Sequence, residues 1–190
     1  MNADFPVVLD ACVLANHSLA DLLLRLAESP RLYLPLWSDQ ILAETTRTLI
    51  KHLEWPEDLA KRRESEIREH FPEALTGFPP ELLTVLSNDQ KDRHVLAAAI
   101  VGKAEVIVTF NLKHFTEEHL RPWKIQARHP QVFLESLWGL DAVGVTSRLA
   151  AISHRRGKSM EQVLRTLQQS VPNFVSQIAA PLGIDLSAQS

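Results

Sequence analysis

The sequence predicts an α/β fold in which a parallel sheet is flanked by helices and followed by a C-terminal helical extension. Short apolar segments typical of buried strands alternate with longer segments whose apolar residues recur at helical spacing. Strands that alternate with helices require right-handed crossovers, which cover both faces of a parallel sheet. From residue 141 onward the segments are helical without a strand pattern. We therefore expect an α/β domain over residues 1–140 and a helical extension over residues 141–190.

The order of the segments defines the expected elements. Strands are expected at residues 5–9, 31–34, 105–110 and 124–127. Helices are expected at residues 17–28, 38–52, 57–70, 87–104 and 130–138. Ser38 suits the N-cap of the second helix, whose core-facing stripe is Leu42, Thr46, Leu49 and Leu53. Proline and glycine residues between positions 72 and 80 predict an irregular connection.

The extension contains start and stop signals for three helices. The first ends before Gly157, and Ser159 with Gln162 forms a capping box that opens the second. The third is expected after Pro172. A short group of helices cannot bury enough surface by itself, so we expect its apolar residues to pack onto the α/β body. These residues are Leu149, Ile152, Leu164 and Leu167.

The composition points to a globular protein of the cytoplasm. Hydrophobic residues make up 45% of the chain and charged residues 23%, which permits a sizeable core. The apolar runs are too short to cross a bilayer, and no secretory signal is recognisable. A single cysteine, Cys12, fits a reducing compartment. The net charge of −3 is not typical of a nucleic-acid-binding protein, but residues 141–190 carry a mild basic excess that leaves such binding open.

Five polar residues are expected near the carboxyl ends of the strands, where parallel sheets bind their ligands. Asp10 comes directly after the first strand and Asn111 after the third. Asp89 and Asp92 lie at the start of the alanine-rich helix, and Glu44 lies in the helix after the second strand. Oxygen ligands of this kind suit Mg²⁺ or Mn²⁺, which can activate a water molecule against a phosphodiester. Metal-assisted phosphodiester hydrolysis is therefore the chemistry that these residues best allow.

The aspartates also have ordinary structural interpretations. Asp10 could cap the turn into the next helix, as aspartate often does. Asp89 and Asp92 have the spacing of a helix cap and a first-turn acid, which the helix dipole favours. The sequence alone leaves capping and catalysis open for Asp89.

The other polar residues have similar alternatives. Glu44 lies on the polar face of its helix, where it could simply pair with Arg47. Asn111 could be an ordinary turn residue. His94 and His114 lack a metal-like partner spacing, so we expect them at the surface or in supporting positions.

Three stretches of the chain resemble the successive motifs of the PIN-domain family. They are VVLDACVLAN, LWSDQILAETTRTL and NDQKDRHVLAAAIVGKAEVIVTFNLKHF. With the order of elements, the resemblance covers roughly residues 5–138 and implies a PIN-like sheet. The chain is most similar in character to the VapC-type toxin ribonucleases of bacterial toxin–antitoxin pairs, in particular a longer subgroup with a helical C-terminal extension.

The resemblance assigns roles to the candidate residues. It implies that Asp10 and Asp92 hold the metal ion and that Glu44 is the helix acid of the site. The family often has an aspartate where this chain has Asn111. We therefore expect the Asn111 side chain to contribute a hydrogen bond rather than to bind the metal ion directly. Asp89 is an additional acid in the same loop. The family further implies ribonuclease activity, Mg²⁺ or Mn²⁺, homodimerisation and an inhibitory antitoxin.

Three functions are compatible with these observations. The first is an endoribonuclease toxin that hydrolyses RNA through the acids at positions 10, 44 and 92. The second is a non-catalytic or weakly catalytic PIN-fold module that binds RNA or a protein, an alternative favoured by Asn111. Clustered acids argue against a pure scaffold, which gains nothing from charges that repel one another. The third is a structure-specific DNA nuclease.

Overall fold

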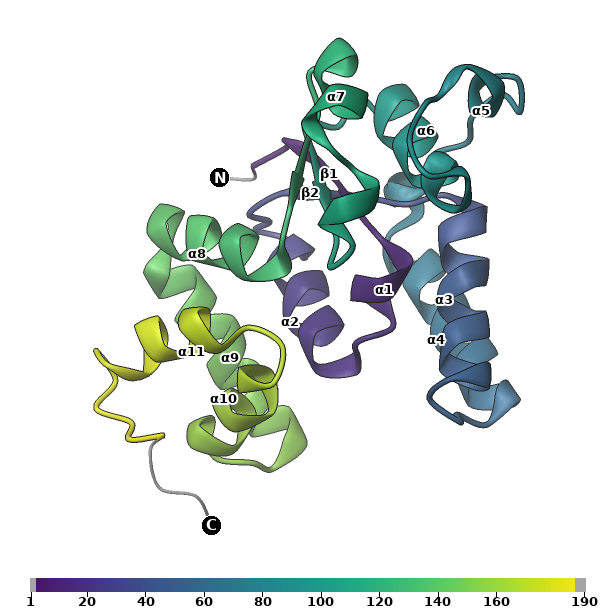
Figure 1. Ribbon diagram of the computed structural model, residues 1–190. Helices are drawn as coiled ribbons and strands as arrows, with labels where there is room; N and C mark the ends of the chain where they lie inside the picture. The colour runs from purple at the N-terminus through teal and green to yellow at the C-terminus, as the bar shows by residue number, and fades with distance from the viewer. Residues whose placement is uncertain (1–2, 187–190) are drawn as a thin grey trace.

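The computed structural model describes residues 3–186 (Figure 1). The strands are β1 (Pro6–Leu9), β2 (Leu34–Leu36), β3 (Val106–Val108) and β4 (Gln126–Arg128). The α-helices are α1 (Ala11–Leu14), α2 (His17–Ala27), α3 (Asp39–Lys51), α4 (Glu57–His70), α5 (Leu82–Val85), α6 (Arg93–Val101), α7 (Glu117–Leu120), α8 (Pro130–Leu140), α9 (Ala142–Arg156), α10 (Met160–Gln168) and α11 (Pro172–Ala179). Short 3-10 turns lie at η1 (Pro72–Ala74), η2 (Gln90–Asp92), η3 (Leu112–His114) and η4 (Arg121–Trp123). Within residues 3–186, no helix has the length and apolar character that a bilayer crossing requires.

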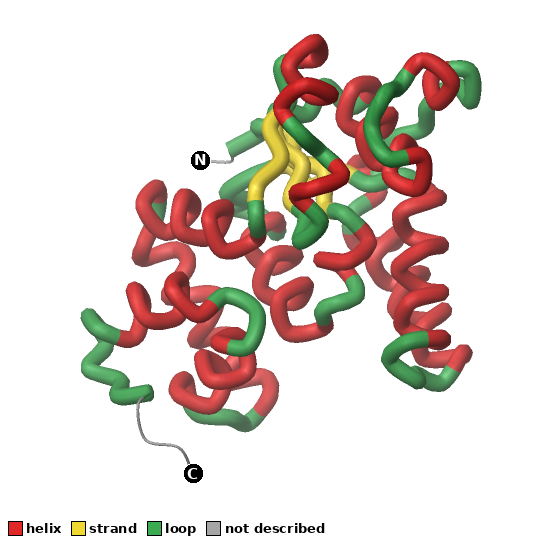
Figure 2. The backbone as a smooth tube through the Cα atoms, viewed as in Figure 1, coloured by secondary structure: helices red, strands yellow, loops and turns green. Residues whose placement is uncertain are grey.

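The four strands form one parallel sheet in the order β2-β1-β3-β4, and helices surround it (Figure 2). From β1 the chain moves outward to β2 and then crosses back to β3 on the other side of β1. The helix α2 packs on β2, whereas α6 packs on β1 and β3. The predicted α/β class is confirmed. A ligand crevice is expected between the carboxyl ends of β1 and β3, because the direction of winding reverses there.

The second strand lies further along the chain than predicted. It spans Leu34–Leu36 rather than residues 31–34. Pro35 does not end it, because an edge strand has one side that pairs with no neighbour and so tolerates a proline. Tyr33 precedes the strand, and its hydroxyl donates to the Leu23 carbonyl at 2.8 Å. The alternating pattern of residues 31–34 therefore lies mostly in the segment before β2 rather than in β2 itself.

The fourth strand also starts later than predicted. It begins at Gln126 rather than at residue 124. Lys124 has a φ of 57°, in the left-handed region, which is incompatible with an extended strand. Pairing with β3 begins where the Gln126 N–H donates to the Glu105 carbonyl at 2.9 Å.

The helix α3 begins where the sequence predicts. Ser38 is its N-cap, and its hydroxyl accepts the Ile41 N–H at 3.3 Å. The predicted core-facing stripe is correct at Leu42 and Leu49, which are buried, whereas Thr46 is only partly buried. The prediction is wrong at Leu53, which lies beyond the end of the helix and is 50% exposed. The buried stripe holds α3 against the body, and α3 also packs against α6.

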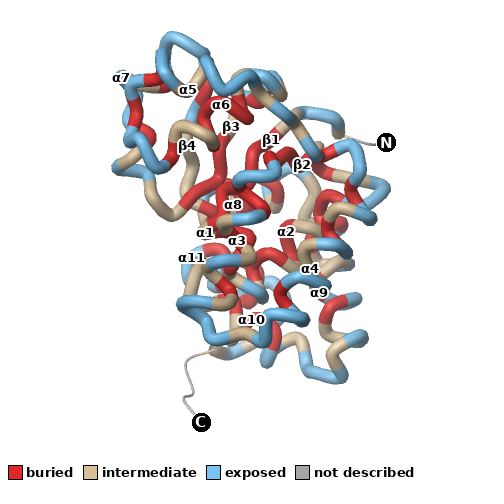
Figure 3. Tube along the Cα trace, turned by 90° about the vertical axis from the view of Figure 1, so that its right-hand side faces the viewer, coloured by how far each residue is buried: buried red, intermediate tan, exposed pale blue. Residues whose placement is uncertain are grey.

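One hydrophobic core continues from the sheet into the C-terminal helices (Figure 3). The helices α9 and α10 pack on α2, and α11 packs on α8. The predicted packing of the extension onto the α/β body is thereby confirmed. The four apolar residues expected to make it are all buried: Leu149, Ile152, Leu164 and Leu167.

Polar contacts also join the extension to α2. The Asp21 carboxylate lies 2.6 Å from the Arg155 guanidinium and 2.8 Å from that of Arg156. The Asp21 side chain is 13% exposed, so water screens these pairs less than it would at the open surface. Nearby, the Asn16 amide donates to the Ser170 hydroxyl at 2.7 Å. The position of α9 and α10 on α2 is therefore specified by charge and hydrogen bonding as well as by apolar packing.

Leu149→Ala is expected to lower the free energy of unfolding of the whole protein by about 2–5 kcal/mol, the usual cost of such a core truncation. Leu149 is fully buried in α9, within the continuous core. Leu140→Ala is the matched control, because Leu140 is 63% exposed and should change stability by less than about 0.5 kcal/mol. Differential scanning calorimetry should show one transition for both variants. Two separate transitions in Leu149→Ala would contradict a shared core.

Candidate active site

Asp10 lies at the carboxyl end of β1, beside the point where the winding of the sheet reverses. The β1–β3 register pairs Leu9 with Val108, so the next residues, Asp10 and Thr109, stand side by side. The Thr109 hydroxyl donates to Asp10 Oδ2 at 2.6 Å, and Asp10 is 2% exposed. Asp10 occupies the N-cap position of α1, but its side chain makes no capping hydrogen bond. Helix capping is therefore not what places this buried carboxylate here.

Cys12 is a second donor to Asp10. Its Sγ donates to Asp10 Oδ2 at 3.2 Å and accepts the Phe110 N–H at 3.4 Å. Burial, followed by the nearby charge of Asp10, raises the pKa of Cys12 to about 12. Cys12 is therefore a neutral thiol at physiological pH and not a nucleophile, since the thiolate is the reactive form. Together with Thr109, it orients the Asp10 carboxylate.

Asp92 lies at the N-terminal end of α6, with a side chain that is 10% exposed. It makes no capping hydrogen bond, and its Oδ2 instead lies 2.8 Å from His114 Nδ1. Burial raises the pKa of Asp92, and repulsion from Asp10 and Asp89 raises it further, whereas His114 acts in the opposite direction. The charged form of Asp92 is thus disfavoured in the folded protein, whereas an aspartate that served only the first turn of a helix would be stabilised by the helix dipole.

Asp89 has the capping role that the sequence allowed. Its Oδ1 accepts the Lys91 N–H at 3.0 Å, at the start of η2. In addition, one carboxylate oxygen each from Asp89 and Asp92 and one ring nitrogen of His114 all lie within 4.8 Å of one another. Two acids and an imidazole at this spacing are suitable donors for a divalent cation. Asp89 can therefore cap η2 and at the same time lie beside Asp92 and His114 as a possible metal ligand.

Glu44 projects from α3 toward α6. Its Oε2 lies 3.2 Å from His94 Nε2, with 40% of the Glu44 side chain exposed. The contact with His94 lowers the pKa of Glu44, and the charge of Arg47 contributes in the same direction. The partner in contact is thus His94 on α6 rather than Arg47 on α3 itself.

Asn111 follows β3 by three residues and is partly buried. Its backbone N–H donates to the Thr109 hydroxyl at 2.9 Å. The same hydroxyl donates to Asp10, so Thr109 connects the turn that carries Asn111 to the acid at the end of β1. The turn is in this way fixed relative to the acidic group.

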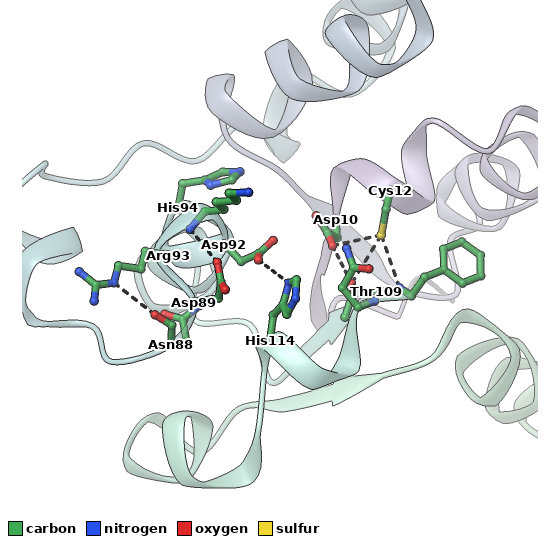
Figure 4. A network of polar contacts seen from close by, with 12 residues as sticks. Asp10, Cys12, Asn88, Asp89, Asp92, Arg93, His94, Thr109 and His114 are labelled. Atoms are coloured by element: carbon green, nitrogen blue, oxygen red, sulfur yellow. Dashed lines mark hydrogen bonds and ion pairs between the residues drawn. The ribbon is translucent and has the colours of Figure 1, made fainter. Parts of the chain in front are cut away.

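Figure 4 shows the carboxylates of Asp10 and Asp92 directed toward a common space, with His114 next to them and Asp89 beside Asp92. Asp10 lies outside the group defined by the 4.8 Å spacing, but it is near enough for its charge to raise the pKa of Asp92. Three of the predicted acids therefore converge. Glu44 is set apart by its contact with a different histidine.

The sequence reasoning missed Thr109 and Cys12 as supports of these acids, and it expected His114 only at the surface or in a supporting position, without naming its partner. Thr109 belongs to the T-x-N turn, and the parallel register of β1 with β3 was the signal that could have identified it. Cys12 is two residues beyond Asp10, a spacing that predicts nothing about contact. His114 reaches Asp92 across 22 positions of sequence, which no local pattern reveals.

The two larger surface cavities lie away from the acids. One, of about 680 Å³, lies beside α7 and β4. The other, of about 610 Å³, lies between α2 and α4 with a contribution from α9, and we call it the α2–α4 cleft. Its apolar lining residues are Leu24, Trp55, Leu59, Ile67 and Phe71. Its basic ones include Arg25, Arg62, Arg63 and Arg155, and its acidic ones are Asp21, Glu28 and Glu66.

A sequence profile of the PIN domain family matches residues 4–113. This chain belongs to the PIN domain family. The matched part of the PIN domain runs from the segment before β1 into η3 and contains all five predicted site positions. It ends one residue before His114.

A curated relative shares part of the sequence. The protein named "Putative ribonuclease VapC50" from Mycobacterium tuberculosis is 56% identical over 54 residues, which make up 28% of this chain. The match spans 32% of the length of that relative, about a third, so it describes a shared segment rather than the whole molecule. No solved structure matches the chain significantly.

The donors of the site fit a hard divalent cation. Carboxylate oxygens are the ligands that Mg²⁺ and Mn²⁺ prefer, and Asp10, Asp89 and Asp92 supply them within one PIN domain. The pKa of Asp92 is raised by burial and by its two acidic neighbours. A cation would offset this repulsion, because a bound metal ion reverses the local electrostatics.

In the metal-free protein, Asp92→Asn should leave the free energy of unfolding unchanged or raise it at neutral pH. The folded protein raises the pKa of Asp92, so its charged form opposes folding above that pKa. The advantage of asparagine should shrink as the pH falls through that pKa, because the aspartate of the wild type then becomes neutral as well. Thermal melts in chelator at neutral and acidic pH measure both effects.

Mn²⁺ provides the second arm of this experiment. A cation at a hundredfold excess over its Kd should stabilise the wild type by about 2.7 kcal/mol and Asp92→Asn by much less. If Asp92 were only a favourable first-turn acid, the variant would instead lose about 0.3–1 kcal/mol in chelator and respond to Mn²⁺ like the wild type. That pair of results would remove Asp92 from the site.

Proposed function

We propose that this protein is a metal-dependent endoribonuclease and acts as the toxin of a type II toxin–antitoxin pair. The observation that carries the proposal is the convergence of Asp10, Asp89 and Asp92 beside the switch point of a PIN domain. Membership of this family supports nuclease chemistry. The relative named as a ribonuclease supports RNA as the substrate.

The proposed roles follow from position and burial. Asp10 and Asp92 are the most buried acids of the group and would hold Mg²⁺ or Mn²⁺. Asp89 and Glu44 are more exposed and would position a second ion or the attacking water. Asn111 would orient these groups from the turn that Thr109 fixes. Residues 1–140 would thus carry the nuclease site, and residues 141–190 would form the extension that supports it.

The bound cation would activate a water molecule and neutralise charge on the phosphodiester. Without a cation, the acids would repel the phosphate group, and the net charge of −3 offers no general attraction to RNA. Attack by water rather than by the ribose 2′-hydroxyl leaves a 5′-phosphate and a 3′-hydroxyl. Action on cellular RNA in the cytoplasm is part of the proposal.

Asp10→Asn should abolish toxicity. Expression of the wild-type chain alone should arrest growth, and the variant should relieve the arrest at equal protein level. Ribonuclease activity of the purified variant should fall by at least about a hundredfold, because even residues that merely orient a metal ligand are worth about 10–100-fold. Asp39→Asn is the matched control, because Asp39 lies at the exposed start of α3 and pairs with Arg68.

Sequencing of the RNA ends that accumulate after brief expression identifies the chemistry. Ends with 5′-phosphate and 3′-hydroxyl groups are expected from the wild type and should be absent with Asp10→Asn. Equal growth arrest by both proteins would exclude catalysis as its cause and would favour a binding module. Cleavage of structured DNA with intact RNA would favour a DNA nuclease.

An antitoxin is the partner that the proposal requires, and homodimerisation is part of the same proposal. The α2–α4 cleft is the surface that best suits the antitoxin. Leu59 is 45% exposed in this cleft, and the apolar floor lies next to several arginines. Burial of Arg63 lowers its pKa, and its guanidinium donates to the Leu14 carbonyl at 2.8 Å. Apolar side chains of a partner segment would match the floor, and an acidic side chain would match Arg62, because Arg25 and Arg155 already pair with Asp21.

Leu59→Asp should leave ribonuclease activity intact and weaken the complex with the cognate antitoxin by about tenfold or more. The reason is that an unpaired carboxylate in an apolar contact must lose its water. Leu140→Asp is the control, since Leu140 is exposed at the end of α8 and does not line the cleft. Co-expression and titration calorimetry give the readouts. An antitoxin that neutralises Leu59→Asp as well as it neutralises wild type would place its binding surface elsewhere.

A further inference from the structure

Asp89, Asp92 and His114 lie close enough together to share a metal ion, and His114 is the one of these three that the PIN domain match does not include. The match ends at residue 113, and His114 closes η3 immediately afterwards. Its side chain is 28% exposed, and its Nδ1 lies 2.8 Å from Asp92 Oδ2. One of its ring nitrogens also lies within 4.8 Å of a carboxylate oxygen of Asp89. An imidazole is therefore placed beside Asp89 and beside Asp92, which the family resemblance assigns to a metal ion.

We propose that His114 is a nitrogen ligand of the metal ion in this protein. The inference rests on the proposed function, because it concerns the same ion that Asp10 and Asp92 would hold. It adds a ligand of a different chemical class to a set of oxygen donors. It also gives the site a preference for Mn²⁺ over Mg²⁺.

The geometry fits a pair of neighbouring ligands. An octahedral ion with ligands at about 2.1 Å places adjacent donor atoms about 3.0 Å apart. The separation of 2.8 Å between His114 Nδ1 and Asp92 Oδ2 is close to that value. A small ion could thus contact both atoms with little movement of either side chain.

Asn111 stands where the PIN-domain family often has an aspartate, and His114 could supply the ligand that is missing there. The resemblance expects an aspartate at position 111, but the chain has an asparagine there and so lacks one anionic donor. His114 lies three residues further along the same turn, and that turn is held to Asp10 through Thr109. A histidine from η3 would thereby replace the ligand missing from the end of β3.

A neutral imidazole also suits the electrostatics of the group. Burial and the charges of Asp10 and Asp89 already raise the pKa of Asp92. A further carboxylate at position 114 would add to this repulsion, whereas an imidazole supplies a lone pair without a negative charge. Imidazole binds transition-metal ions more readily than Mg²⁺, which prefers oxygen ligands. Mn²⁺ should therefore gain more from His114 than Mg²⁺ does.

Pulsed electron paramagnetic resonance of bound Mn²⁺ tests the ligand directly, because it detects nitrogen atoms coordinated to the ion. The samples are the full-length chain with Mn²⁺ alone, as wild type, His114→Gln, His114→Asn and His94→Gln. His94→Gln is the matched control. Like His114, His94 contacts an acid of the candidate site, with its Nε2 3.2 Å from Glu44 Oε2.

The wild type and His94→Gln should both show histidine nitrogen coupling, and both His114 variants should lack it. Calorimetric titration should show that the Kd for Mn²⁺ rises by about tenfold or more in the His114 variants, with a smaller rise for Mg²⁺. Melting in chelator should be similar for all four proteins, which would show that the variants fold.

Coupling that persists in both His114 variants would overturn the inference, as would Mn²⁺ binding to wild type without nitrogen coupling. In either case His114 would only orient Asp92 by a hydrogen bond, and the proposed metal-dependent function would stand. Failure of the wild type to bind Mn²⁺ at millimolar concentration would overturn the inference and the proposed function together.

Discussion

The parallel pairing of β1 with β3 determines where the chemistry of this protein can take place. Leu9 pairs with Val108, and this register brings the next residue of each strand, Asp10 and Thr109, into contact at the carboxyl edge. The Thr109 hydroxyl then links Asp10 to the turn that carries Asn111. A shift of β3 by one residue against β1 would turn Thr109 to the other face of the sheet and break this contact. The site is therefore a consequence of strand pairing.

The acidic group is maintained against electrostatic repulsion. Asp10 and Asp92 are buried. Burial raises the pKa of Asp92, and the charges of Asp10 and Asp89 raise it further. His114 reduces this cost through its contact with Asp92, whereas His94 contacts Glu44, which lies apart from these three acids. Like charges held together at the expense of stability are typical of functional sites, where a cation or substrate supplies the compensating charge.

The helix α2 connects the site to the C-terminal extension. It follows Asp10 and α1 directly, packs on β2, and receives α9 and α10 on its other side. Asn16 caps α2 through the Leu19 N–H at 3.2 Å and also donates to Ser170. Asp21, on the same helix, pairs with two arginines of α9. The extension therefore supports the segment that immediately follows the first acid of the site.

Local pattern was sufficient for features that depend on neighbouring residues: the α/β class, the Ser38 cap, the capping box at Ser159, and the acids after β1 and before α6. It placed the second strand too early, because tolerance of Pro35 depends on β2 being an edge strand. The contacts of Asp10 with Thr109 and of Asp92 with His114 span 99 and 22 positions. Only the tertiary structure decided these, because strand register and helix packing, rather than any spacing in the chain, bring such side chains together.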